Sequence, residues 1–158
     1  MWQMIRLTLL LSCVVSCTSK PGPPTASAAE TAIVQQYCEK AFACESSWDS
    51  NEHLQDFVEP FTTSAAGCET KYVLSSSDLA TLDSDVASGR VVYNDQTTQG
   101  CLDNNDAESC GDWFDYPGDA PPQHCDGAFV GKVALGQACQ LTLECVAGNC
   151  QARICTNQ

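Results

Sequence analysis

The sequence has few basic residues and few histidines, and these shortages exclude several classes of function. Seven Lys and Arg stand against 20 Asp and Glu, which gives a formal net charge of −13. A protein with that charge repels nucleic acid and anionic lipid head groups, so we expect no nucleic-acid partner. The two histidines, His53 and His124, lie outside any recognisable catalytic or zinc-binding motif.

Several motifs that carry chemistry are also absent from the sequence. There is no Gly-x-Ser-x-Gly motif, which argues against a serine hydrolase of the common type. There is no Cys-x-x-Cys pair, which argues against a zinc ribbon and against a thioredoxin-like redox site. We therefore predict a protein that is not an enzyme and that binds no metal or cofactor.

The longest apolar run lies near the N-terminus and is short. Residues 7–15 are almost wholly apolar and follow Arg6, which carries the one charge before them. Nine residues cannot cross a bilayer, which requires about 20 residues as a helix. The pattern instead predicts a signal peptide over residues 1–16, although plain cleavage as a soluble exported protein stays an alternative.

The residues that end this segment are Val14-Val15-Ser16-Cys17. They resemble the bacterial lipobox, and the resemblance implies cleavage after Ser16 and lipid attachment to Cys17. The resemblance also implies a membrane partner reached through the covalent lipid anchor, whose several acyl chains give stable anchoring. Thr18 stands where an Asp would resemble an inner-membrane retention signal. The expected location is therefore the cell envelope, at the outer membrane.

Twelve cysteines in 158 residues indicate an oxidising compartment and a fold that disulfides hold together. Leu10-Leu11-Ser12-Cys13 is a weaker lipobox, and choosing it would leave Cys17 as an odd thiol. With Cys17 lipidated and Cys13 removed, an even number remains, and we expect these to form five disulfides: Cys38, Cys44, Cys68, Cys101, Cys110, Cys125, Cys139, Cys145, Cys150 and Cys155.

Residues 17–28 are predicted to be a proline-rich tether, and residues 29–110 a helical body. A first helix is expected over 29–44, with its apolar stripe facing inward. Asp49 is expected to cap a second helix, and Ser77 a third that stops at Gly89. Asn94 or Asp95 is expected to cap a fourth. The inward residues expected for the first and second helices are Val34, Tyr37, Cys38, Ala41, Phe42, Leu54, Phe57, Val58 and Phe61.

Residues 111–158 are predicted to be an irregular cysteine-rich module. Its end, GQACQLTLECVAGNCQARIC, resembles the small Dickkopf-N-type module in its cysteine and glycine spacing. Sequence alone does not choose among the possible pairings. Our expectation is Cys139–Cys150 with Cys145–Cys155, interleaved as in many small modules, and Cys110–Cys125. The remaining four, Cys38, Cys44, Cys68 and Cys101, would then join the helices. Cys38 and Cys44 lie on different sides of one helix and should not pair with each other.

Two further clusters each have two interpretations. The acidic run at 103–119 begins like an EF-hand loop, but Ala107 and Glu108 replace a ligand and the turn glycine. We expect a solvated acidic loop there, with an irregular calcium site as the alternative. Trp113, Phe114 and Tyr116 are expected to cover the disulfide of Cys110; the alternative is a stacking platform for sugar or a proline-rich peptide.

The sequence therefore predicts a small disulfide-rich, mainly α protein. We expect an exported, lipid-anchored protein with a non-catalytic binding, adhesion or structural role and a partner in the envelope or outside the cell. The alternative from another class is a secreted small effector, such as an inhibitor or toxin-like protein, or a calcium-binding protein.

Overall fold

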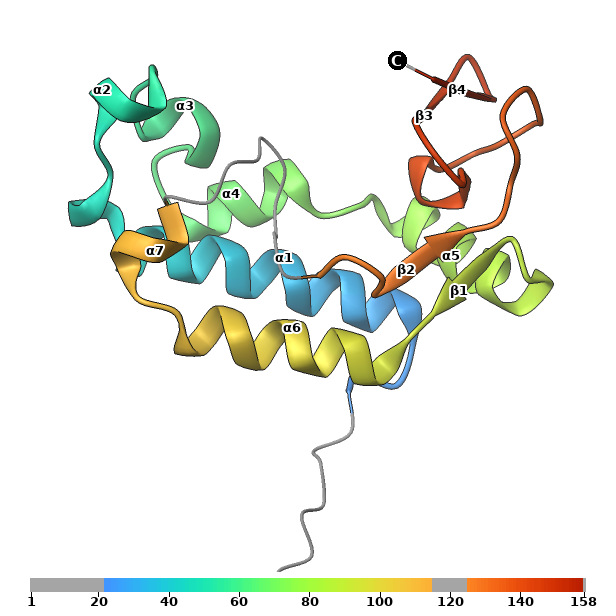
Figure 1. Cartoon of the computed structure of the whole chain (residues 1–158), viewed down its shortest axis with the longest axis horizontal. Helices are drawn as coiled ribbons and strands as arrows, with labels where there is room; N and C mark the ends of the chain where they lie inside the picture. The colour runs from blue at the N-terminus through green and yellow to red at the C-terminus, as the bar shows by residue number, and fades with distance from the viewer. Residues whose placement is uncertain (1–21, 115–124, 158) are drawn as a thin grey trace, which may run out of the picture.

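The computed structural model describes residues 22–114 and 125–157 and has the predicted character, small, disulfide-rich and mainly helical. Helix α1 lies at the centre, with α4 and α6 packed along it (Figure 1). Helices α2, α3 and α7 gather at one end of the molecule, and α5, the β1–β2 pair and the C-terminal segment lie at the other. The elements are α1 (Ala26–Ala43), η1 (Glu45–Ser47), α2 (Ser50–His53), α3 (Val58–Phe61), α4 (Ala65–Tyr72), α5 (Ser76–Ser88), β1 (Val91–Tyr93), α6 (Asp95–Ala107), α7 (Cys110–Phe114), β2 (Phe129–Gly131), η2 (Thr142–Glu144), β3 (Asn149–Gln151) and β4 (Ile154–Thr156).

Polar side chains fix where the longer helices begin. Thr25 accepts a hydrogen bond from the Ala28 amide, so α1 starts at Ala26 and takes in residues 26–28, which we had expected in the tether. The third predicted helix, α5, is capped by Ser75, and the expected cap Ser77 lies inside it. Of the two candidate caps for α6, the structure uses Asn94.

The predicted second helix is broken, and this prediction is wrong in part. Asp49 caps α2, but that helix has four residues and ends at His53, because the next residue, Leu54, has a left-handed backbone (φ 60°); Leu54 is 90% exposed. The chain restarts in α3, where Phe57 and Phe61 turn inward and Val58 stays exposed. The break separates Leu54 from the face that Phe57 and Phe61 share, one helical turn apart.

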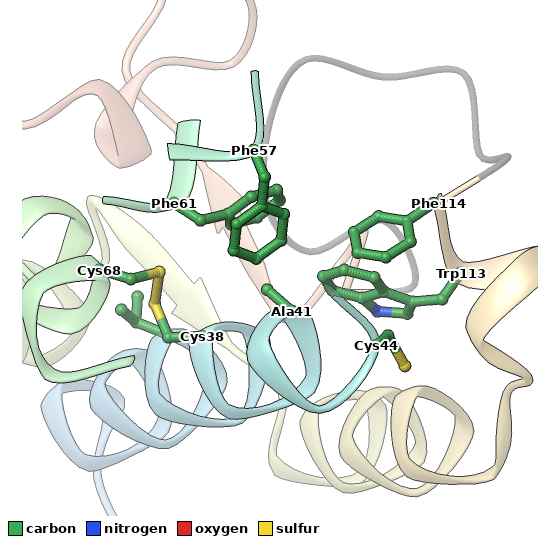
Figure 2. Packing of buried hydrophobic residues seen from close by; sticks show 9 residues of the cluster. Cys38, Ala41, Cys44, Phe57, Phe61, Cys68, Trp113 and Phe114 are labelled. Carbon is green, nitrogen blue, oxygen red and sulfur yellow. A yellow bond between two sulfur atoms is a disulfide. The ribbon is translucent and has the colours of Figure 1, made fainter. Parts of the chain in front are cut away.

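The main core lies where the end of α1 meets the aromatic residues of the α3 and α7 regions. Phe57 stacks on Phe61 with ring centroids 4.7 Å apart, and Trp113 contacts Phe114 at 4.8 Å. Figure 2 shows these rings over the end of α1, above Ala41. Aromatic pairs of this kind contribute about 0.5–1.5 kcal/mol each beyond their buried area. Trp113 and Phe114, which we had placed in the C-terminal module, therefore belong to the core of the helices.

The C-terminal segment is attached to the helices by backbone pairing. Strand β2 pairs antiparallel with β1, opposing Val91 to Gly131, and Val91 is buried in a second small core. Beyond it, β3 and β4 form a hairpin around Ala152 and Arg153, both at positive φ. Left-handed non-glycine residues are costly, and the hairpin is held by disulfides on both of its strands.

All ten cysteines from Cys38 onward are paired in the structure. The C-terminal pairs are the interleaved ones that we expected, Cys139–Cys150 and Cys145–Cys155. The expected pair Cys110–Cys125 is wrong. Cys110 pairs with Cys44, Cys125 with Cys101, and Cys38 with Cys68.

The reason for this error is spatial. Cys44 caps the end of α1 and Cys110 opens α7, so both lie at the same end of the main core. Cys101 faces inward from α6 and meets Cys125 beside Ile33 and Ala128.

Candidate functional site: the Glu30 groove

A groove lies between α1, the chain that follows α4, and the C-terminal segment. Its volume is about 360 Å³, within the size range of small-molecule sites. Most of its walls are apolar, and the acid Glu30 is among the buried residues that line it. We call it the Glu30 groove and define it by Glu30, Ile33, Val34, Leu74, Phe129 and Leu143.

Glu30 is placed in the groove by the helical repeat of α1. Ile33 and Val34 follow it by three and four residues, so all three side chains lie on one face of the helix. The sequence thus places an acid on an otherwise apolar stripe. Glu30 is consequently only 8% exposed, a degree of burial that acidic residues reach rarely unless they are paired.

Only one of the two carboxyl oxygens of Glu30 has a hydrogen-bond partner among the described residues. One oxygen accepts a hydrogen bond of 3.3 Å from the backbone amide of Leu74. The other, Oε2, is buried and has no hydrogen-bond partner among residues 22–114 and 125–157. Burial raises the pKa of Glu30, and the Leu74 amide opposes this only in part.

The groove has a second acid and no neutralising cation in the part of the chain described. Asp126 lies at its exposed edge. The ion pairs found in this part of the chain all involve Arg90, so none reaches Glu30. The Tyr72 hydroxyl, also at the groove, already donates to the carbonyl of Pro60 at 2.7 Å. The arrangement offers a free, buried acceptor within apolar walls, which suits binding of a molecule with a hydrogen-bond donor.

A second buried charged cluster joins the C-terminal segment to the helices. Arg90 donates to the Glu144 carboxylate through Nε (2.8 Å) and Nη2, and Nη2 also donates to the carbonyl of Ala138. Its Nε lies 3.5 Å from Asp85 Oδ1. The Glu144 side chain is fully buried, and that of Asp85 is 5% exposed.

The pKa values of the two acids of this cluster shift in opposite directions. Burial would raise the pKa of Glu144, but donors on Leu141, Gln140 and Arg90 lower it below its ordinary value. Burial and the neighbouring Glu144 raise the pKa of Asp85. Glu144 accepts hydrogen bonds from Arg90, Gln140 and Leu141, so it ties the C-terminal segment to the chain after α5, and we regard this cluster as structural.

The clusters predicted from sequence are placed differently. Residues 103–107 are in α6, so the prediction of an acidic loop is wrong for these residues. Their side chains point to different sides of a helix. Trp113 and Phe114 are 4% and 6% exposed, so these two rings cover the core beside Cys110 and are not a surface platform. Tyr116, His124 and Cys17 lie outside the described residues, and His53 lies in α2.

Three sulfur atoms also lie close together, those of Cys139, Cys145 and Cys155, within 4.8 Å of one another. Each of these cysteines is in a disulfide, and metal ligation requires a thiolate. They therefore do not form a metal site while the disulfides are intact.

Neither Glu30 nor the Arg90 cluster was singled out from the sequence. The signal for Glu30 was its position four residues before Val34, on the apolar stripe of the predicted first helix. The signal for Arg90 was weaker, because its partner Glu144 is 54 residues away along the chain.

Comparison with known proteins gives no further information on this site. No family model matches the chain, and no curated protein or solved structure matches it either. None of the helices described in residues 22–114 and 125–157 is both long and apolar enough to cross a membrane.

Proposed function

We propose that this chain is an exported, lipid-anchored protein of the cell envelope with a non-catalytic binding, adhesion or structural role. The observation that carries the proposal is the pairing of all ten cysteines from Cys38 to Cys155 in five disulfides. Disulfides in such number persist outside the reducing cytosol, so the fold itself favours export.

The same pairing supports a distinct role for Cys17. The folded body needs no further cysteine, and Cys17 stands at the last position of the lipobox-like Val14-Val15-Ser16-Cys17. Diacylglyceryl and amide-linked acyl chains on this residue would supply anchoring that a single chain cannot. The ten paired cysteines, in turn, offer no thiolate for nucleophilic catalysis or zinc binding.

Labelling with radioactive palmitate in a Gram-negative host tests the anchor. The matched variants are Cys17→Ala and Cys13→Ala, the same change at the preferred and the rival position. We expect label and membrane association in the wild type and in Cys13→Ala, and neither in Cys17→Ala. Undiminished label in Cys17→Ala would overturn the proposal.

The non-catalytic role has a separate test. If the protein were a hydrolase, it would turn over a substrate, and changing His53 or His124 to alanine would abolish that turnover. We expect no turnover of ester, peptide or glycoside substrates above that of a buffer control. Turnover that either substitution abolishes would contradict the assignment.

A further inference from the structure

We propose that the Glu30 groove is a binding site for a small apolar molecule that carries a protonated amine. This inference rests on the binding role proposed above, but it does not depend on the lipid anchor. It names the chemistry of the ligand and the group that recognises it.

The first argument is the unpartnered oxygen of Glu30. A buried polar atom without a partner is costly, more so when it is charged, and native structures contain few of them. Glu30 Oε2 is such an atom among the described residues, and Glu30 lines the groove. A glutamine or leucine at this position would avoid the cost of burying a charge. Local rules are most often broken at functional sites, and a ligand donor would complete the missing hydrogen bond.

The second argument is the shape and lining of the groove. A volume of about 360 Å³ accommodates a small organic molecule. Ile33, Val34, Phe129 and Leu143 supply apolar contacts, and one polar group among such walls fixes orientation, as in most small-molecule sites. A bare metal ion fits this lining poorly, because calcium binds six to eight oxygen ligands.

The third argument is charge. Asp126 adds a second acid at the edge of the groove, and the chain as a whole has a formal net charge of −13. An acidic surface raises the local concentration of cations and repels anions. An ammonium group also donates three hydrogen bonds, and hydrogen bonds between charged groups are about twice as strong as neutral ones.

The test uses three six-carbon probes that differ in the head group: hexylammonium, 1-hexanol and hexanoate. Each is titrated into the purified oxidised protein at pH 7 and followed by calorimetry and by backbone amide NMR. We expect hexylammonium to bind with a dissociation constant of about 1 mM or lower, which is within the range that so few atoms can supply. Hexanol should bind more weakly, and hexanoate should not bind.

The matched variants are Glu30→Gln and Glu39→Gln, the same change on the groove face of α1 and on a different face. Loss of one charge-assisted hydrogen bond should weaken hexylammonium binding at least about tenfold in Glu30→Gln. Glu39→Gln should bind as the wild type does. Binding to the wild type should also weaken as pH falls, because protonation of Glu30 removes the negative charge.

A readout that needs no variant locates the ligand. The amides of Leu74 and Gly127 lie at the groove and should shift on addition of hexylammonium, with saturation matching the calorimetry. Absence of hexylammonium binding, equal affinity for hexanol, or unchanged affinity in Glu30→Gln would overturn the inference. If addition of calcium chloride displaces hexylammonium, this result would also overturn the inference and would favour a cation site. None of these results would alter the palmitate labelling, so the two proposals fail separately.

Discussion

Replacing Arg90 with methionine should destabilise the protein strongly, although the Arg90 side chain is partly exposed. The substitution keeps most of the aliphatic stem and removes the only cation that contacts Glu144 and Asp85 in the described structure. Glu144 would then keep two backbone donors, from Gln140 and Leu141, but no countercharge. Two buried carboxylates would face each other.

The magnitude follows from burial. Removing one partner of a fully buried ion pair costs about 3–5 kcal/mol. The Arg90 side chain is 38% exposed, so water already screens part of the interaction and can enter when the side chain is shortened. We therefore expect a loss of about 2–3 kcal/mol in the free energy of unfolding, between the buried value and the value below 1 kcal/mol typical of surface pairs.

Urea denaturation of the oxidised protein at pH 7, followed by circular dichroism, measures this loss. With a slope of about 2 kcal/mol/M, the midpoint should fall by about 1–1.5 M. Arg153→Met, the same change at an exposed position of the C-terminal hairpin, is the matched control and should shift the midpoint little. The double variant Arg90→Met/Glu144→Gln should lose less than the sum of the single losses. A loss below about 0.5 kcal/mol in Arg90→Met would show that Arg90 does not stabilise the two buried acids.

Three further predictions concern the helices. Removing Cys44–Cys110, which spans 66 residues, by a double change to serine should cost about 4 kcal/mol in the chain-entropy treatment, measured by denaturation against the oxidised wild type. Burial raises the pKa of Glu30 in the folded protein, so the unfolded chain releases this proton at a lower pH. The free energy of unfolding therefore falls as pH rises from the ordinary pKa of a glutamate towards the raised pKa of the folded protein. Glu30→Gln should therefore be more stable than wild type at neutral pH, with the difference vanishing below the ordinary pKa. Gly89→Ala, at φ 77°, should cost about 1 kcal/mol, whereas Gly100→Ala on the exposed face of α6 should stabilise by a similar amount; equal effects would contradict the assigned cap.

The parts of the fold that sequence predicts well depend on local chemistry. The apolar stripe of α1, the stop at Gly89 and a cap at Asn94 or Asp95, of which the structure uses Asn94, arise from residues within one or two turns of each other. The interleaved pairs of the C-terminal hairpin are also local, since their cysteines are 10 and 11 residues apart.

The parts that sequence does not predict depend on contacts between distant segments. Cys110 pairs with Cys44 across the main core because α7 folds back on the end of α1, and no local pattern indicates this. The break at Leu54 leaves an exposed leucine where periodicity predicts a buried one. The Glu30 groove likewise forms only when Leu74 and Phe129 are brought to α1.

The intact mass of the protein extracted from membranes, before and after reduction, tests the lipid anchor and the five disulfides together. We expect the mass of residues 17–158 plus the acyl groups of a lipoprotein, and a gain of ten hydrogens on reduction, two for each of five disulfides. An unacylated chain would contradict the anchor at Cys17, and a smaller gain would contradict the pairing of all ten cysteines.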